Sequence, residues 1–197
     1  MAMDIADCLR LLAARREDEL VVTSAGNSSE VWWEVTSDTT STFYLEASMS
    51  LSTMFAAGLA LGYPQARFWG FIGDGAFVMN TGVLFVEKAM ALPNMVTVII
   101  ANRCYAATNG SELPMGAEID FAAVVRAAGI ERVFTFSTIE ALAAGFDEAF
   151  KTPGPTTVVL ELDPPNRHYD SPPFDGPELK YRFGRALEEK FSRRVLP

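Results

Sequence analysis

Apolar runs alternate along most of the chain with segments in which apolar residues recur every three or four positions. The runs predict buried strands at 20–23, 67–72, 95–101, 132–135 and 156–162. The periodic segments predict helices at 4–16, 30–35, 47–62, about 80–91, 120–128 and 138–150. Strands and helices in this alternation are typical of an α/β fold. We therefore expect a doubly wound, mostly parallel sheet with helices on both faces.

The pattern changes after residue 163. The chain is rich in proline from Pro164 to Pro177 and ends in a charged amphipathic segment, Glu178 to Arg194. We divide it into one domain at 1–163 and an arm with a C-terminal helix at 164–197. The helix is interpreted either as docking on a partner or as a loosely packed tail.

Amino-acid composition limits the kinds of partner and cell compartment that we expect for this protein. The chain has 197 residues, with 16 Lys and Arg against 25 Asp and Glu, and a net charge of -9. It lacks the basic face that nucleic acid requires, and no window approaches the ~20 apolar residues of a membrane span. Residues 1–16 lack the apolar centre of a signal peptide, and the two cysteines, Cys8 and Cys104, have no metal-type spacing. We expect a cytoplasmic protein with reduced thiols.

Two polar side chains follow two of the predicted strands. Asp74, flanked by Gly73 and Gly75, ends one strand, and Asn102 ends the next. Parallel strands bring both to one edge of the sheet, where ligands of such folds bind. Mg²⁺ and Ca²⁺ prefer such oxygen ligands and often add phosphate oxygens to their shell, while the glycines allow close approach of phosphates. The small polar segment 24–29 is either an anion-binding loop or a solvated turn. These features predict a diphosphate-bearing cofactor held through a metal.

These motifs, and other segments of the chain, resemble those of a known enzyme family. The Gly73-Asp74-Gly75 and Asn102 pair resembles the diphosphate-binding motif of thiamine diphosphate (ThDP) enzymes. Residues 43–50 and 58–62 are similar to the "FYMLGSMG…GLGLAL" segment of sulfopyruvate and phosphonopyruvate decarboxylases, and residues 73–82 and 102–110 to their "GDGSLLMNLG" and "DNxxYGSTGG". The likeness covers Val21 to Leu162. It identifies the diphosphate-binding (PP) domain of ThDP-dependent 2-oxo acid decarboxylases, which resembles the separate β subunit of sulfopyruvate decarboxylase and the C-terminal domain of phosphonopyruvate decarboxylase.

The resemblance implies roles for particular residues. The side chains of Asp74 and Asn102 and the carbonyl of Cys104 would bind Mg²⁺. Met49 would bend the cofactor into its V shape, and the Ala47 carbonyl would accept a hydrogen bond from the 4′-amino group. The remaining cofactor contacts fall on Ser28, Gly73, Gly75, Ala76 and Tyr105.

The resemblance also implies an activity. ThDP and Mg²⁺ would serve the decarboxylation of a small anionic 2-oxo acid, such as sulfopyruvate or phosphonopyruvate, to an aldehyde and CO₂. The glutamate that activates the cofactor at N1′ belongs to a pyrimidine-binding (PYR) domain, for which this chain has no room. We therefore assign no catalytic residue to this chain. We expect a PYR-domain α subunit as partner, in a hetero-oligomer of α₂β₂ or larger composition.

Departures from the motifs leave other interpretations open. Small replacements occur at Ala47, Ser50, Ala76, Ala101, Ala106 and Asn109. The substrate therefore need not be sulfopyruvate. Arg103 either faces an anionic substrate or lies on the surface, and a surface role is expected for His168. The alternatives are an acetolactate synthase-like carboligase, a 2-oxoacid oxidoreductase β chain and a non-catalytic PP-domain scaffold. The oxidoreductase chains commonly carry cysteines for an iron–sulfur cluster, which two isolated cysteines cannot supply.

Overall fold

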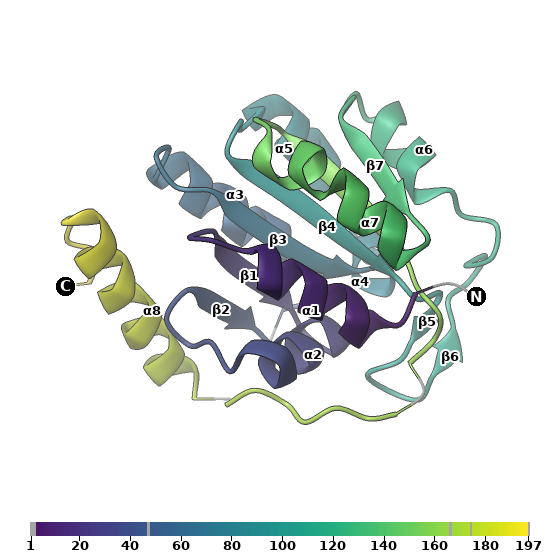
Figure 1. The fold of residues 1–197 in the computed structure, drawn as a ribbon, viewed down its shortest axis with the longest axis horizontal. Helices are drawn as coiled ribbons and strands as arrows, with labels where there is room; N and C mark the ends of the chain where they lie inside the picture. The colour runs from purple at the N-terminus through teal and green to yellow at the C-terminus, as the bar shows by residue number, and fades with distance from the viewer. Residues whose placement is uncertain (1–2, 47, 166, 174, 197) are drawn as a thin grey trace.

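A parallel sheet of six strands, with helices on both faces, forms the body of the molecule (Figure 1). The computed structural model describes residues 3–46, 48–165, 167–173 and 175–196. The strand order is β2-β1-β3-β4-β8-β7, and every pairing in this sheet is parallel. The strands are β1 (Leu20–Ser24), β2 (Thr42–Leu45), β3 (Phe68–Gly73), β4 (Met95–Ala101), β7 (Val133–Phe136) and β8 (Thr156–Glu161). The predicted fold class is confirmed.

Helices pack on the two faces of this sheet. They are α1 (Ile5–Arg15), α2 (Asn27–Thr36), α3 (Ser52–Gly62), α4 (Asp74–Met79), α5 (Val83–Met90), α6 (Phe121–Ala127), α7 (Ile139–Phe146), which continues into a π-helical turn η1 (Asp147–Lys151), and α8 (Gly176–Phe191). The side chains of α1, α2 and α7 share one buried cluster with Trp69 and Phe71 of β3. Those of α3 to α6 pack on the other face, around Ile72 and Phe68. Both faces of β3 and β4 are therefore buried, which explains their continuous apolar runs.

Several element boundaries differ from the predictions. Helix α2 begins at Asn27 and α3 at Ser52, so both start away from the predicted positions 30 and 47. A separate short helix, α4, follows β3 directly, and Asn80 leaves the helical conformation before α5 begins. A two-stranded antiparallel ribbon, β5 (Cys104–Tyr105) with β6 (Ser111–Glu112), was not predicted. Its strands of two residues each are too short for an alternating pattern to show.

The topology creates a ligand position between β1 and β3. From β1 the chain first adds β2 on one side and then returns to add β3 on the other. Connections therefore leave in opposite directions at the carboxyl ends of these two strands, and this divergence opens a crevice. In the neighbouring pair, Gly73 of β3 is in register with Ile100 of β4. Asp74 and Asn102 thus follow adjacent strand ends.

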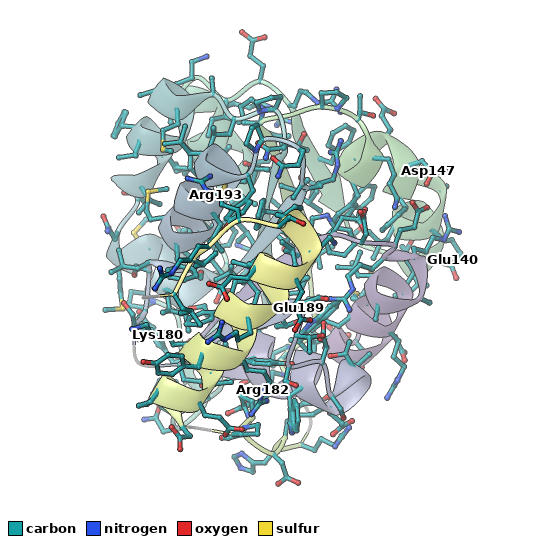
Figure 2. All side chains as sticks on the ribbon, turned by 90° about the vertical axis from the view of Figure 1, so that its left-hand side faces the viewer. Glu140, Asp147, Lys180, Arg182, Glu189 and Arg193 are labelled. Atoms are coloured by element: carbon teal, nitrogen blue, oxygen red, sulfur yellow. The ribbon has the colours of Figure 1, made fainter. Side chains whose placement is uncertain are left out.

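The C-terminal segment packs back on its own chain. It runs beneath α2 in Figure 1 and leads to α8, which lies beside β2. Leu179, Phe183 and Leu187 form the buried side of α8, and the rings of Phe183 and Phe43 have centroids 5.4 Å apart. Figure 2 shows α8 across this side of the molecule, with Lys180 exposed on it. None of the described helices is long and apolar enough to cross a membrane.

Candidate cofactor site

A cavity of about 290 Å³ opens at the carboxyl ends of β1, β3 and β4, at the crevice that the topology creates. Its walls come from the start of α2, from the segment after β2, from the β3–α4 junction and from the loop after β4. The lining residues are Ala25 to Ser28, Glu30, Glu46, Met49, Gly73 to Ala76, Ile100, Asn102, Cys104 to Thr108 and Ser171. Most residues that the sequence assigned to the cofactor therefore meet in one place.

Asp74 is the most deeply buried charged group in this cavity, with 2% of its surface exposed. Its Oδ1 accepts a hydrogen bond from the Gly75 N–H at 2.8 Å, and its Oδ2 accepts one from the Arg103 N–H at 2.5 Å. Burial raises the pKa of Asp74 to about 6, and the two N–H donors oppose this rise. No cationic side chain forms an ion pair with it among the described residues. Such a carboxylate is well suited to a metal ion.

Asn102 is buried beside it, with 6% of its surface exposed. Its Oδ1 accepts a hydrogen bond from the Cys104 N–H at 3.2 Å. This turn holds the Asn102 side chain against the backbone of the β4–β5 loop, at the cavity wall that also contains Cys104. The structure thus brings the three predicted metal-binding residues to one cavity.

The first turn of α2 forms the opposite wall. Gly26 caps this helix with φ of +89°, and a Cβ atom there would lie 2.7 Å from the Cβ of Ala107, so only glycine fits. The Ser28 hydroxyl donates to the Ser24 carbonyl at 2.7 Å. Because the first N–H groups of a helix lack intrahelical acceptors, those of Asn27 and Ser28 remain for a ligand. Any contact from Ser28 to a diphosphate would therefore use its N–H group.

The structure treats the other predicted cofactor contacts differently. Tyr105 packs against the backbone of Gly75, so its ring shapes the cavity wall. The Gly75 N–H is already bonded to Asp74, which leaves Ala76 as the better N–H donor of the α4 turn. Met49 lines the cavity with 43% of its surface exposed, as a residue that contacts a cofactor would be. Ala47 lies outside the described residues.

Two glutamates in the cavity were not predicted as site residues. Glu30 lies in the first turns of α2, and Glu46 follows β2. Burial raises the pKa of Glu46 to about 7, with the Ser29 hydroxyl opposing the rise and the Glu30 carboxylate adding to it. Burial also raises the pKa of Glu30. The sequence predicted that this helix begins at residue 30, whereas α2 begins at Asn27. With the wrong start, the prediction could not show that Glu30 lies on the side of α2 that faces the cavity.

Glu46 should make stability depend on pH. Its folded pKa of about 7 lies above the ordinary value of 4.5, so the folded state keeps a proton that the unfolded chain has released. Stability therefore falls as pH rises across this window. We expect Glu46→Gln to raise the unfolding midpoint by about 2–4 °C near pH 8 and to change it little near pH 4, measured by thermal scans. Glu112→Gln, at an exposed position on β6, is the matched control. Equal shifts at both pH values would contradict this assignment.

Arg103 and His168 lie outside the cavity lining. The Arg103 guanidinium is held by Glu161 and by two carbonyl groups, so it does not face a substrate in this cavity. His168 is exposed, as expected, and lines a larger hollow of about 940 Å³ between the loop after β4 and the proline-rich arm. That hollow contains neither Asp74 nor Asn102. The smaller cavity, which contains both of these residues, is therefore the candidate cofactor site.

Fold and cavity together define a domain of the doubly wound α/β class, with a cavity at the carboxyl edge of its sheet, where ligands of such folds bind. Residues 24–160 match the family model "Thiamine pyrophosphate enzyme, C-terminal TPP binding domain". The chain belongs to this family, and the predicted resemblance is confirmed.

Relatives of known name agree with this family. The chain is 29% identical over 183 residues to the sulfopyruvate decarboxylase subunit beta of Methanothermobacter thermautotrophicus, covering 93% of this chain and 95% of the relative. It is 30% identical over 160 residues to the phosphonopyruvate decarboxylase of Streptomyces viridochromogenes, covering 81% of this chain and 40% of that protein.

Solved structures show the same fold in longer enzymes. A thiamine diphosphate-dependent 4-hydroxybenzoylformate decarboxylase from Rhodococcus jostii RHA1 superposes with a TM-score of 0.70 at 22% identity, over 82% of this chain and 33% of that one. Benzoylformate decarboxylase from Polynucleobacter necessarius gives 0.69 at 17% identity, over 87% of this chain and 34% of its own. The present chain thus spans about a third of these enzymes.

Proposed function

We propose that this chain is the PP-domain subunit of a ThDP- and Mg²⁺-dependent decarboxylase that converts a small anionic 2-oxo acid to an aldehyde and CO₂. The relatives named above act as sulfopyruvate and phosphonopyruvate decarboxylases, and substrates of that type are the first to test. ThDP, when bound, supplies the electron sink for decarboxylation. Residues 1–163 would hold it, and the arm at 164–197 would support this domain.

The charge of the cavity carries this proposal. Its lining contains three carboxyl groups, those of Glu30, Glu46 and Asp74, and no lysine, arginine or histidine among the described residues. A diphosphate would be repelled here unless a cation intervened. Asp74 and Asn102 provide the oxygen atoms that Mg²⁺ prefers, and the cation would offset the cost of burying the Asp74 charge. The pKa of Glu46, raised to about 7, leaves that carboxyl about half protonated near neutral pH, which lowers the remaining repulsion.

Each wall of the cavity has a part in binding. Asp74, Asn102 and the Cys104 carbonyl would hold the metal, while N–H groups at Ser28 and Ala76 would donate to the diphosphate. Met49 would pack against the cofactor and hold it in its bent shape. The chain supplies no group in the described cavity that we assign to proton transfer at N1′. That carboxylate would come from a PYR-domain α subunit, consistent with the "subunit beta" in the name of the Methanothermobacter relative.

An exposed apolar face next to the cavity supports such a partner. Seven of the eleven large apolar side chains exposed among the described residues lie in two stretches, at 49–55 and 78–86. They include Met49 at the cavity mouth, Phe55 of α3 and Phe85 of α5, and α3 contacts α5 directly. Exposed apolar side chains gathered on neighbouring elements in this way are typical of an interface. We propose that the α subunit covers it, in an α₂β₂ or larger assembly, and so completes the site.

Phe85→Glu should prevent this assembly. The Phe85 side chain is 68% exposed, so a charge there is harmless to the separate chain but costly in an apolar interface. We expect the complex with the companion PYR chain to weaken about 100-fold or more, measured by size exclusion with light scattering. Tyr181→Glu on α8, also an exposed aromatic position, is the matched control. Equal assembly of the two variants would contradict the proposed interface.

The decisive test combines binding with product analysis. The chain is co-expressed with a companion PYR-domain chain, ThDP binding is measured by calorimetry with and without Mg²⁺, and products are followed for sulfopyruvate, phosphonopyruvate and pyruvate. The proposal predicts Mg²⁺-dependent binding and release of CO₂ and an aldehyde. A carboligase would instead consume an added aldehyde, an oxidoreductase would require an electron acceptor, and a scaffold would bind no ThDP.

A further inference from the structure

Arg103 holds an unusual backbone position next to the predicted metal site. It follows Asn102 directly, and its φ of +63° lies in the left-handed region, which side chains other than glycine, asparagine and aspartate seldom adopt. In this conformation its N–H donates to Oδ2 of Asp74 at 2.5 Å. Because Oδ1 accepts from the Gly75 N–H, both carboxylate oxygens are oriented by main-chain donors.

The Arg103 side chain fixes this conformation from outside the cavity. Its Nη1 donates to the carbonyl oxygens of Gly116 at 2.7 Å and Ile119 at 2.6 Å, and its Nη2 donates to Oε2 of Glu161 at 2.5 Å. The guanidinium carbon lies 4.6 Å from the centre of the Phe121 ring. These partners come from the loop before α6, from α6 and from the end of β8. One side chain thus joins two separate segments, 116–121 and the end of β8, to the loop after β4.

The main chain of Arg103 is held at its carbonyl as well. The Leu113 N–H donates to the Arg103 carbonyl oxygen at 2.9 Å. The Arg103 peptide is therefore bonded to Asp74 on one side and to the loop before α6 on the other. A planar guanidinium with several donors suits this arrangement, because it can reach two carbonyls and a carboxylate at once.

We propose that Arg103 is a positioning residue, whose anchored side chain holds its own N–H against Asp74 and so sets the orientation in which that carboxylate meets a divalent cation. The inference rests on the proposed function, since it concerns the proposed metal. It assigns Arg103 no contact with substrate. Outer contacts that orient a metal-binding carboxylate commonly change metal affinity by about 10–100-fold when removed.

The test compares Arg103→Ala with Arg67→Ala in the full chain with its companion. Arg67 is the matched control, because its guanidinium also donates to two carbonyls, those of Phe150 at 3.1 Å and Thr152 at 3.0 Å, at the opposite edge of the sheet. Both variants should lower the unfolding midpoint. Only Arg103→Ala should weaken Mg²⁺-dependent ThDP binding, by about tenfold or more in calorimetry. Arg103→Lys, which keeps one charged donor group, should recover part of that affinity and serves if the alanine variant does not fold.

A second readout needs no cofactor. Amide hydrogen exchange of the cofactor-free chain should show faster exchange at residues 102–105 in Arg103→Ala and no change there in Arg67→Ala. ThDP affinities within twofold of each other for the two alanine variants would overturn the proposal, as would a raised KM for the 2-oxo acid with unchanged ThDP affinity. If the wild-type chain binds no ThDP, the proposed function fails, and the exchange rates alone decide whether Arg103 orders the loop.

Discussion

Replacing Asp74 by asparagine is expected to abolish Mg²⁺-dependent cofactor binding while leaving the fold intact. Asparagine has the same shape but no charge, so the strongest metal ligand of the proposed site is lost. The loss of one hydrogen bond from the flanking N–H donors is opposed by relief from burying a carboxylate that is 2% exposed. ThDP affinity should fall by about 100-fold or more, and decarboxylation should disappear with it.

Thermal unfolding gives the clearest measurement of this effect. ThDP and Mg²⁺ at about 100 times the Kd should stabilise the wild-type chain by about 2.7 kcal/mol, which raises the midpoint by roughly 5–10 °C. The Asp74→Asn midpoint should not move. Asp147→Asn, at an exposed position of the η1 turn, is the control and should respond like the wild type. A full ligand-induced shift in Asp74→Asn would rule out this residue as the metal ligand.

The second large effect is expected at Gly75. A Cβ atom there would lie 2.5 Å from Cε1 and 2.8 Å from Cδ1 of Tyr105, well inside van der Waals contact. Gly75→Ala must therefore move the Tyr105 ring or the start of α4, which carries Asp74. We expect a loss of about 1–3 kcal/mol in the free energy of unfolding and at least a tenfold loss of ThDP affinity, by chemical denaturation and calorimetry.

Two further variants test this cause. Gly73→Ala is the matched control, because no atom lies within 4 Å of a Cβ built there and its φ is -70°. It should unfold like the wild type. Tyr105→Ser removes the ring, so combining it with Gly75→Ala should restore most of the stability lost in the single variant. A Gly75→Ala chain as stable as Gly73→Ala would show that the ring moves without cost.

Five of the six strands of the sheet could be predicted, most of them because burial on both faces leaves a continuous apolar run, whereas β2 was not predicted. The runs at 67–72 and 95–101 end within one residue of β3 and β4, and the polar residues after them fall where the sheet has its ligand edge. Parallel topology then brings Asp74 and Asn102 together without knowledge of any other contact. The confirmed family explains why the motif spacing was informative.

Contacts between distant segments left no such signal. In the sequence, Arg103 only follows the predicted metal-binding residue Asn102, and nothing nearby indicates what its side chain binds. The acceptors of its hydrogen bonds lie 13 to 58 positions further along the chain. The charge state of Glu46 depends on its burial near Ser29 and Glu30, which follows from packing rather than from residue order. Short elements such as α4 and β5 are set by turns and by tertiary contacts, so periodicity could not reveal them.

Helix α8 also covers one edge of the sheet. Strand β2 is the last strand on its side, and an unshielded last strand offers free N–H and C=O groups to any extended peptide. Phe183 of α8 packs on Phe43 of β2, so the helix shields this margin. Truncation before α8 would uncover it, and the shortened chain should self-associate into β-rich aggregates at concentrations where the intact chain stays dispersed.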